Sequence, residues 1–449
     1  MAEKSYKTFF KGKKITMLGL GLLGRGVNVA KFLAGLGAEL TITDLKTAEA
    51  LESSLKQLKK FSNIRYVLGE HKLEDFRNRD IVIKSAGVPF DSIYVAEARA
   101  HNIPVEMDAS LFAKFSPARI IGVTGTRGKS TVTHLVEHIL KGAYPGRVFV
   151  GGNVRGMATL PLLKKVKLDD FAVFELDSWQ LQGFGDAKIS PEVAVFTNFL
   201  SDHMNYYRGD MEMYFNDKAN IFKYQKKGDT LILGEQSEKE IKKRKVKVEG
   251  RVVVAHPNIL PKSWKVKIPG EHNRKNIACA ILVCRTLGVP EKFIKRGVET
   301  FAGVPGRLEH IRTVGGIKYV NDTTATTPDG NRAAILALRE KVRKNIVLIA
   351  GGNDKNLDYS GMAKLINQNV KALVLIKGTA TDKILALLPP KHPYLLGVIG
   401  SMKEAVKIAR QNAKRGDTIL LSPGSASFGV FKNEFDRGDQ FIHAVKLLV

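Results

Sequence analysis

A glycine-rich segment that begins at Gly122 carries the residue types that hold a polyphosphate. It runs Gly122-Val-Thr-Gly-Thr-Arg-Gly-Lys-Ser-Thr131, after an apolar strand pattern and before a helical pattern. Glycines let backbone N–H groups approach phosphate oxygens, and the amino end of a helix adds partial positive charge. Lys129 can neutralise the outer phosphates, and the Ser130 hydroxyl can bind Mg²⁺. The segment predicts a nucleoside triphosphate site made by Gly125, Thr126, Gly128, Lys129, Ser130 and Thr131.

This segment departs from the strict phosphate-loop pattern at one position. Val123 stands where that pattern has its first glycine, so an accidental glycine turn is the alternative interpretation. The apolar strand before the loop and the helix after it favour nucleotide binding, because together they aim the backbone N–H groups at a phosphate.

Three polar residues downstream of the loop are candidates for a metal site. Glu175 ends an apolar strand pattern, and a carboxylate at a strand end beside a phosphate loop is well placed for Mg²⁺. His203 follows Asn198 by five positions, and Lys218 follows Tyr214 by four. Taken alone, Glu175 could be a turn carboxylate, His203 is more often structural than a ligand, and Lys218 would be a solvated helix lysine.

A second glycine motif lies near the start of the chain. Gly19-Leu-Gly-Leu-Leu-Gly24 follows a predicted strand, and Asp44 comes about twenty residues later, the spacing of a dinucleotide-binding turn. On this motif alone the chain could be an NAD-dependent dehydrogenase. A single motif of this kind is weak support, and that interpretation leaves the loop at Gly122 without a function.

Taken in chain order, these motifs resemble those of the Mur ligase superfamily, the ATP-dependent amino-acid ligases of peptidoglycan precursor synthesis and their folylpolyglutamate synthetase relatives. The segments Val123–Thr131, Asn198–Met204 and Tyr214–Phe222 each match a family motif. Three later matches are Gly270-Glu-His-Asn-Arg-Lys-Asn276, Gly306-Arg-Leu-Glu309 and Asn321-Asp322. The resemblance covers essentially the whole chain.

Within the family, the chain is most similar to members that add D-glutamate to UDP-N-acetylmuramoyl-L-alanine. This similarity depends on the chain length, on Gly-Lys-Ser-Thr in the loop, on Gly151-Gly-Asn153, and on Leu421–Phe428 followed by Phe431-Lys-Asn433. It implies a cytoplasmic, monomeric enzyme that uses ATP with Mg²⁺ or Mn²⁺ to form an amide bond through an acyl phosphate. Alternatives within the family are a folylpolyglutamate synthetase, or a Mur ligase that adds L-glutamate or another amino acid.

The resemblance also implies a role for each motif. Two metal ions would be held by Ser130, Glu175, His203 and Lys218, the last carbamoylated by CO₂. ATP would further contact Asn273, Asn276, Arg307 and Asp322. The catalytic groups would be Lys129, His203, Lys218 and Arg307. The UDP-muramoyl substrate would contact Leu22, Leu23, Asp44, Lys46, Ser85, Gly87, Asn153, Asp177 and Gln180, and glutamate would contact Thr326, Lys355, Ser427 and Phe428.

Some positions leave a simpler interpretation open or depart from the family pattern. The leucine pair in the first glycine motif could pack at a helix start, and Lys355 could be an ordinary loop lysine. The family usually has Asp-Arg where this chain has Asn205-Tyr206, and often a lysine where it has Thr324. The family's Phe-Lys-Asn-Phe-Glu is Phe431-Lys-Asn-Glu-Phe435 here, a change in the glutamate pocket that bears on which amino acid is added.

The elements that must position these residues follow an alternation of short apolar strands with amphipathic helices. Strands are expected at 14–19, 39–43, 80–84, 118–123, 171–175, 193–197, 345–350, 372–376 and 417–421, with helices at 24–36 and 130–141. The alternation predicts an α/β protein with parallel sheets in three domains. We expect a Rossmann-like domain over 1–115, a central P-loop domain over 116–303, and a C-terminal Rossmann-like domain over 304–449 that binds the amino acid and closes on ATP.

The composition excludes several classes of protein. Hydrophobic residues make up 44% and charged residues 26% of the 449 residues, which is typical of globular domains. No apolar run has the length of a membrane span, and the two cysteines are too few for a disulfide framework. The net charge of +27 suits anionic substrates. The densest basic run, Lys242–Lys247, has no interleaved aromatics and therefore does not favour nucleic-acid binding.

Overall fold

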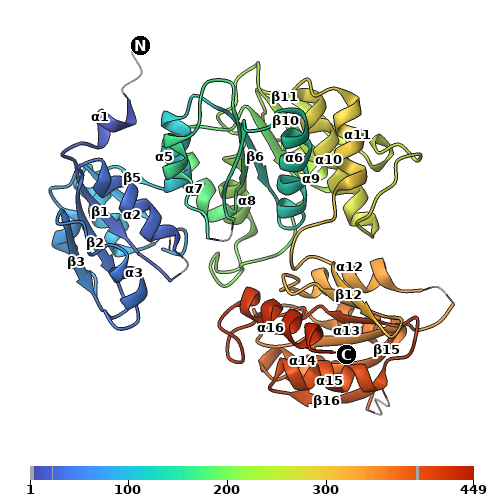
Figure 1. Ribbon diagram of the computed structural model, residues 1–449. Helices are drawn as coiled ribbons and strands as arrows, with labels where there is room; N and C mark the ends of the chain where they lie inside the picture. Colours follow the sequence, from blue (N-terminus) through green and yellow to red (C-terminus); the bar gives the residue numbers. More distant parts are fainter. Residues whose placement is uncertain are drawn as a thin grey trace. The chain divides into compact units, whose positions relative to one another are not determined.

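The computed structural model describes residues 5–22, 24–89, 91–154, 156–340, 342–390 and 394–448 (Figure 1). Its helices and strands form a mixed α/β protein with three β-sheets. The chain divides into two compact units. The first contains residues up to 202, 209–259 and 278–295, and the second contains 203–208, 260–277 and the residues from 296 onward.

The first sheet is parallel throughout and has the order β3-β2-β1-β4-β5. Its strands are β1 (Lys14–Leu18), β2 (Glu39–Asp44), β3 (Ile64–Leu68), β4 (Ile81–Lys84) and β5 (Val105–Glu106), with helices α1 (Tyr6–Phe10), α2 (Arg25–Gly35), α3 (Glu52–Lys56) and α4 (Ile93–Ala100) and the 3₁₀ turn η1 (Leu73–Phe76). The strand order reverses between β1 and β4, and in open α/β sheets ligands bind at the carboxyl ends of the strands beside such a reversal.

The second sheet is also parallel and has the order β11-β10-β9-β6-β8-β7. Its strands are β6 (Arg119–Thr124), β7 (Val148–Gly152), β8 (Phe171–Glu175), β9 (Val193–Phe196), β10 (Thr230–Gly234) and β11 (Arg251–Ala255). The helices of this part are α5 (Asp108–Phe115), α6 (Lys129–Ala143), α7 (Ser178–Ala187), α8 (Met211–Ala219) and α9 (Glu235–Lys243), with η2 (Leu160–Lys164) and η3 (Pro257–Ile259). The order reverses around β6, the strand that leads into the phosphate loop.

Two helices, α10 (Glu271–Thr286) and α11 (Glu291–Thr300), precede the third sheet, which has the order β12-β13-β17-β14-β15-β16. Its strands are β12 (Glu309–Val314), β13 (Ile317–Asn321), β14 (Ile346–Gly351), β15 (Val370–Ile376), β16 (Leu395–Ile399) and β17 (Thr418–Leu421). Its helices are α12 (Pro328–Leu338), α13 (Ser360–Asn369), α14 (Thr379–Leu387), α15 (Met402–Asn412) and α16 (Glu434–Lys446). The last strand, β17, enters the sheet between β13 and β14.

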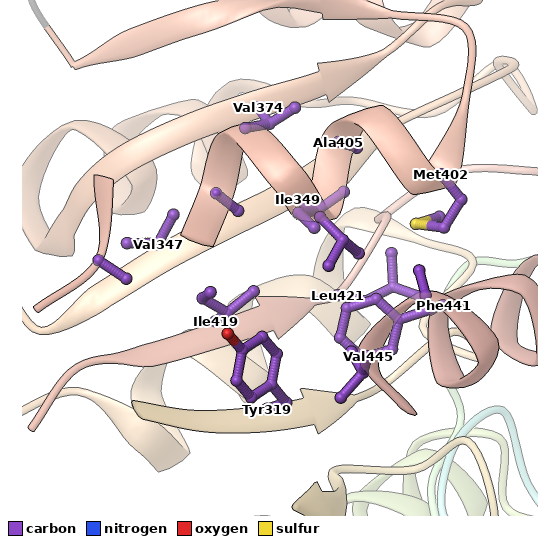
Figure 2. Close-up of a cluster of buried hydrophobic side chains, with 14 of the residues drawn as sticks. Tyr319, Val347, Ile349, Val374, Met402, Ala405, Ile419, Leu421, Phe441 and Val445 are labelled. Carbon is purple, nitrogen blue, oxygen red and sulfur yellow. The ribbon is translucent and has the colours of Figure 1, made fainter. Parts of the chain in front are cut away.

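The core of the third sheet lies on both of its faces. Alternate strand residues such as Ile349 and Leu421 face α15 and α16, where they pack with Phe441 (Figure 2). Their neighbours, such as Leu348, face α12, α13 and α14. Successive side chains of a strand point to opposite faces, so a strand covered by helices on both sides must be apolar at nearly every position. The apolar run Ile346–Ala350, buried at every residue, meets that requirement.

The three-domain α/β architecture predicted from the sequence is confirmed, while the domain boundaries stay predictions. The sheets of the first two domains are parallel as predicted, and the third contains one antiparallel pair, β12 with β13, which the alternation of strands and helices did not predict. The reason is the short turn at Gly315-Gly316, with φ of 56° and 75°, which closes a two-residue hairpin. A parallel crossover would need a connection of a dozen residues or more.

Part of the basic run at Lys242–Lys247 has a structural role. The Arg244 guanidinium lies 4.4 Å from the centre of the Phe215 ring and donates a 2.7 Å hydrogen bond to Glu212, and it also pairs with Glu240. This arginine therefore covers apolar surface and balances two carboxylates. In the described part of the chain, no helix is both long enough and apolar enough to cross a bilayer.

We expect Ile349→Ala to lower stability strongly, because Ile349 lies in the core shown in Figure 2. Ile349 is fully buried, so truncation should lower the free energy of unfolding by about 2–5 kcal/mol. Val398→Ala, on the sheet's edge strand with 46% of the residue exposed, is the control and should change it by about 0.5 kcal/mol or less. Calorimetric unfolding measures both variants, and equal shifts would contradict the packing described here.

Candidate active site

The phosphate loop lies between β6 and α6, at the reversal of the second sheet. Gly125 has a φ of 141°, and a Cβ there would overlap Thr197 Oγ1 at the end of β9. Gly128 is the N-cap of α6 with a φ of 85°. Both positions require glycine, one for close approach and one for its backbone conformation. Gly122, at the start of the glycine-rich segment, lies within β6, in agreement with the strand expected at 118–123, and a Cβ there would come 2.5 Å from Pro191 Cγ.

The end of β9 fixes the shape of this loop through a set of hydrogen bonds. The Asn198 side chain accepts from Arg127 N at 2.8 Å and donates to Arg127 O at 3.1 Å, while Asn198 O accepts from Thr126 N at 2.9 Å. Thr197 Oγ1 also donates to Arg127 O at 2.5 Å. These bonds use the N–H groups of Thr126 and Arg127, and Lys129 and Ser130 follow at the amino end of α6, the part of the loop predicted to meet phosphate.

Thr126 and Thr131 are both buried beside this loop. Thr126 Oγ1 donates to Leu200 O at 3.0 Å and accepts from Leu200 N at 2.9 Å, so its hydroxyl anchors the loop to the segment after β9. The predicted ATP contact of Thr126 stays a prediction, and its observed contacts are internal. Thr131 is 7% exposed in the first turn of α6.

Lys129 and Lys218 converge on one backbone oxygen. Lys129 Nζ donates to Gly125 O at 2.9 Å, and Lys218 Nζ donates to the same oxygen at 3.0 Å. Lys218 is only 1% exposed, so the interpretation of it as a solvated helix lysine is wrong. Burial and the nearby charge of Lys129 lower the pKa of Lys218 well below its ordinary value. The two amines lie where negative charge from a polyphosphate or a modified lysine would be stabilised.

Glu175 and Asn153 are joined through the backbone at the end of β8. Glu175 is 5% exposed, and its carbonyl oxygen accepts a 2.6 Å hydrogen bond from Asn153 N. The close approach depends on Gly152, where a Cβ would overlap Glu175 O. The candidate metal carboxylate and the candidate substrate amide therefore lie on adjoining strand ends.

Asp177 and Gln180 form a capping box at the start of α7. Gln180 N donates to Asp177 Oδ1 at 2.7 Å, and Asp177 N donates to Gln180 Oε1 at 3.4 Å. Their side chains thus satisfy backbone groups at a helix end. The predicted contacts of these two residues with the muramoyl part of the substrate stay predictions.

The first glycine motif is held by Asp44 at the end of β2. Asp44 Oδ2 accepts from Leu20 N at 2.8 Å and from Gly21 N at 3.0 Å, and Oδ1 accepts from Lys46 N at 2.9 Å. Burial opposes ionisation of this carboxylate, but these backbone donors outweigh it and lower the pKa of Asp44. Both oxygens therefore accept hydrogen bonds from the chain itself, which weakens the dehydrogenase interpretation, in which this carboxylate would bind a ribose.

Around the same reversal, the remaining predicted substrate residues are mostly accessible. Ser85 and Gly87 follow β4 and are exposed, and a Cβ on Gly19 would come 2.6 Å from Ser85 Oγ. Leu22 is 59% exposed, so its interpretation as a packing residue is wrong. Leu23 lies outside the described residues.

The third sheet brings together the four residues predicted to bind glutamate. Lys355 Nζ donates to Thr326 Oγ1 at 3.2 Å, which joins the loops after β14 and β13. Asn353 pairs by backbone bonds with Ala426 at 3.0 and 2.9 Å, and its side chain donates to Phe428 O, which joins the loop after β17. Ser427 is buried, and Phe428 is 63% exposed. The three loops meet where β17 lies between β13 and β14.

Asp322 ties the loop at Arg307 to the ends of β13 and β17. Its Oδ1 accepts from Leu308 N at 3.1 Å, and its Oδ2 accepts from Ser422 Oγ at 2.8 Å. Burial raises the pKa of Asp322 to about 7, against the opposing effect of these donors and of Arg307. Its predicted contact with the ATP ribose stays a prediction.

Three other predicted site residues lie in the second compact unit, namely Asn273, Asn276 and His203. Asn273 Nδ2 donates to Pro269 O at 2.7 Å, and Asn276 Nδ2 donates to Asn273 Oδ1 at 3.3 Å, so both amides order the start of α10. His203 has a left-handed φ of 57°, a conformation that costs free energy in a residue with a side chain and recurs at functional sites.

The side chains beside the phosphate loop fit a magnesium site in which the protein supplies only a few of the ligands. Within the part of the chain that the structure describes, no three His, Cys, Asp or Glu side chains cluster in a way that could hold a metal. Ser130 and Glu175 supply one hydroxyl and one buried carboxylate beside the phosphate position. Mg²⁺ commonly takes one or two carboxylates and completes its shell with phosphate oxygens and water, so this set is sufficient.

Sequence reasoning missed two residues that shape these sites. Asn198 belongs to one of the family segments, but its spacing does not reveal that it holds Arg127 of the phosphate loop, 71 positions earlier. Gly26, not Gly24, is the glycine at which α2 approaches the loop after β1 most closely, since a Cβ there would overlap Leu20 O, whereas one on Gly24 meets nothing within 4 Å. The clustering of glycines around α2 was the only available signal.

Comparison with known proteins gives matches along the whole chain. Three family models match, described as "Mur ligase MurD-like, N-terminal domain" at residues 13–106, "Mur ligase middle domain" at 123–255, and "Mur ligase, glutamate ligase domain" at 306–424. The UDP-N-acetylmuramoylalanine--D-glutamate ligase of Roseiflexus sp. (strain RS-1) is 38% identical, covering 97% of this chain and 98% of that protein. The protein of the same name from Borreliella afzelii (strain PKo) is 36% identical, covering 98% of each.

Solved structures share the fold. UDP-N-acetylmuramate-alanine ligase MurC from Thermotoga maritima superposes with a TM-score of 0.60 at 19% identity, covering 97% of this chain and 99% of that chain. MurF ligase from Thermotoga maritima, in complex with ADP, gives a TM-score of 0.60 at 17% identity and covers 97% of this chain and 95% of that chain.

The packing of the phosphate loop predicts the effect of Gly125→Ala. The added Cβ would overlap Thr197 Oγ1 and displace the loop, so ATP should bind at least about 100-fold more weakly, equal to about 3 kcal/mol. Gly142→Ala in α6 is the control, because a Cβ there meets nothing within 4 Å and alanine favours a helix. Calorimetric titration with ATP measures both variants. Equal affinity of Gly125→Ala and the unsubstituted chain would contradict the loop's role.

Proposed function

The chain belongs to the Mur ligase family, and from that membership we propose that it joins D-glutamate to UDP-N-acetylmuramoyl-L-alanine with cleavage of ATP, a step in making peptidoglycan precursors. The observation that carries the proposal is identity of more than a third, over nearly the full length, to two ligases named for that reaction. The pairing of Lys355 with Thr326 supports an acidic amino acid, because a cation held at 3.2 Å from a loop hydroxyl can receive a carboxylate.

The first chemical step activates the substrate's carboxyl group. An oxygen of the alanine carboxylate attacks the γ-phosphorus of ATP, the bond from that phosphorus to the bridging oxygen breaks, and ADP leaves with the electron pair. The product is an acyl phosphate. Lys129 and Arg307 stabilise the negative charge on the transferred group, and this kind of electrostatic stabilisation is the main source of rate in phosphoryl transfer.

The second step forms the amide. The amino group of D-glutamate attacks the acyl carbon, a tetrahedral intermediate forms, and the carbon–oxygen bond to phosphate breaks as the nitrogen loses a proton. Positioning of the two reactants, with the amino acid held by the loops of the third sheet, would supply most of what this step needs. His203 is a second candidate for a role here, as the base that takes the proton.

Two Mg²⁺ ions, or Mn²⁺, would be held by Ser130, Glu175, His203 and a carbamate formed on Lys218 by CO₂. Bound there, they would supply positive charge to the phosphates. The support for carbamoylation is that the buried Lys218 amine shares Gly125 O with Lys129, and that burial and the Lys129 charge lower the pKa of Lys218. A lowered pKa favours the neutral amine that reacts with CO₂, and a carbamate on Lys218 would attract the Lys129 ammonium group.

The wider setting is proposed on the same basis. We infer a cytoplasmic monomer acting on small molecules, with no nucleic-acid or membrane partner. The two cysteines, Cys279 and Cys284, are buried and unbridged, which fits a reducing compartment. The boundaries at residues 115 and 303, and closure of the last domain on ATP, belong to this proposal.

The acceptor panel is the test of the proposed function. Phosphate release should require ATP with Mg²⁺, UDP-N-acetylmuramoyl-L-alanine and D-glutamate together, and should be at background level when any one is left out. L-glutamate, L-lysine and diaminopimelate are the comparison amino acids. Turnover with one of these but not with D-glutamate would show that the subgroup is wrong, and turnover with a folate in place of the UDP substrate would indicate a folylpolyglutamate synthetase.

The carbamate on Lys218 has its own test. Lys218→Ala should reduce ligation at least about 100-fold, as expected for loss of one group that stabilises transferred charge. Short carboxylic acids such as acetate should restore part of the activity, because they can place an anion in the space left by the side chain. Lys223→Ala, an exposed lysine five residues further along, is the control.

A second measurement for Lys218 does not depend on activity. The unsubstituted protein, incubated with ¹³C-bicarbonate, should give a carbamate carbonyl signal in its ¹³C NMR spectrum, and Lys218→Ala should lack it. A spectrum without this signal, together with full activity of Lys218→Ala, would remove the proposed modification.

A further inference from the structure

Arg437 is a fully buried arginine that none of the sequence motifs accounts for. It lies in the first turns of α16, and its residue exposure is 0%. Burying a guanidinium costs considerable free energy unless its donors find acceptors. Burial lowers the pKa of Arg437 to about 10, which leaves it charged at neutral pH. A buried charge is unusual in this helix, whose other buried residues include Phe441 and Val445 of the apolar cluster.

The guanidinium of Arg437 joins two loops of the third sheet. Its Nη2 donates to Thr323 O at 2.7 Å and its Nε donates to Thr323 Oγ1 at 3.1 Å, both in the loop after β13. Its Nη1 donates to Ser425 O at 3.3 Å, in the loop after β17. The acceptors are two carbonyls and a hydroxyl, while the carboxylates of Asp322 and Glu434 act on it only at longer range.

The helix around Arg437 is fitted to the same loop. Thr323 Oγ1 donates to Glu434 O at 2.7 Å, and a Cβ on Gly438 would come 2.6 Å from Thr323 Cγ2. The amino end of α16 and the β13 loop are therefore in close contact over more than one turn. This contact leaves little freedom for Thr323 to move while Arg437 is in place.

The two loops carry three of the four residues that bind glutamate in the proposed function. Thr326 lies three residues after Thr323, and Ser427 and Phe428 lie two and three residues after Ser425. We propose that Arg437 is a positioning residue that locks these loops into one arrangement and thereby sets the affinity for the acidic amino acid. This inference rests on the proposed function, in that it assigns the pocket to the incoming amino acid.

A purely structural role would be served better by an apolar side chain. Replacing a buried charge by a hydrophobic residue of similar size is often neutral or stabilising, because the desolvation cost disappears. What methionine cannot supply at this position is three directed hydrogen bonds to two separate loops. Stability and loop geometry are thus distinguishable at this residue.

ATP binding should depend on Arg437 much less than amino-acid binding does. Asp322, the ATP candidate on the same β13 loop, is held by Ser422 Oγ and Leu308 N, at 2.8 and 3.1 Å. Neither of these bonds involves Arg437. The KM for ATP therefore serves as an internal reference, and so does the KM for the UDP substrate.

The experiment compares Arg437→Met and Arg437→Lys with Val445→Ala, a buried position of the same helix in the apolar cluster. Arg437→Met should raise the KM for the amino acid at least about 10-fold, since small misplacement of binding groups costs this much or more, with less than twofold change in the KM for ATP. Arg437→Lys keeps the charge and part of the donor set and should fall between. Val445→Ala should lower the melting temperature and leave all three KM values unchanged.

Hydrogen exchange supplies a readout that does not need turnover. Amides in 323–327 and 425–428 should exchange faster in Arg437→Met and Arg437→Lys, and at the original rate in Val445→Ala. A rise in the amino-acid KM of less than twofold in Arg437→Met, or an equal rise in Val445→Ala, would overturn the positioning role. The amino acid used is whichever one supports phosphate release by the unsubstituted enzyme, so failure of D-glutamate as acceptor is seen first and separately.

Discussion

The candidate sites of this protein all depend on one constraint of parallel β-sheets. Where the strand order reverses, the connections on either side of the central strand leave toward opposite faces, and a crevice remains at the carboxyl ends. The three sheets reverse beside β1, beside β6, and where β17 enters between β13 and β14. The first glycine motif, the phosphate loop and the loops around Lys355 occupy these three places. A single topological rule, repeated three times, thus provides a separate place for each of the three reactants in the proposed function.

Topology alone gives a crevice, and polar side chains then fix its loops. Asp44 holds the first glycine motif with its carboxylate, Asn198 holds the phosphate loop with its amide, and Arg437 holds two loops of the third sheet with its guanidinium. Asp44, Asn198 and Arg437 each hold a loop, but with different chemical groups. The reason is that some loop segments offer backbone N–H donors, which need an acceptor, and others offer carbonyl acceptors, which need a donor. Each forms at least two bonds, which fixes orientation as well as distance.

Charge within the second site is arranged for an anionic ligand. Lys129 and Lys218 share one carbonyl oxygen, and negative charge brought by a ligand, or made on Lys218, would be stabilised beside them. This local arrangement is a more specific reason to expect an anionic ligand than the net charge of +27. Part of that charge serves packing and ion pairs, as Arg244 does. For the proposed function, the positions of a few charged side chains matter more than the total charge of the chain.

The sequence by itself determined the features that depend on neighbours along the chain. The phosphate loop, the strand runs at 171–175 and 346–350, and the family motifs all lie within short segments, where spacing and residue type carry the information. Because these segments occur in the same order as in the Mur ligase family, the resemblance also predicted the kind of reaction.

Only the tertiary structure decided which of these residues meet and which are buried. Lys218 reaches Gly125 across 93 positions, and Arg437 reaches Thr323 across 114, so no local pattern could reveal either contact. The same holds for Gly122, whose role follows from the approach of Pro191, and for the antiparallel edge strand β12. The physical reason is that burial and hydrogen-bond partners are properties of the packed sheets, and a sequence motif specifies only the segment that enters the packing.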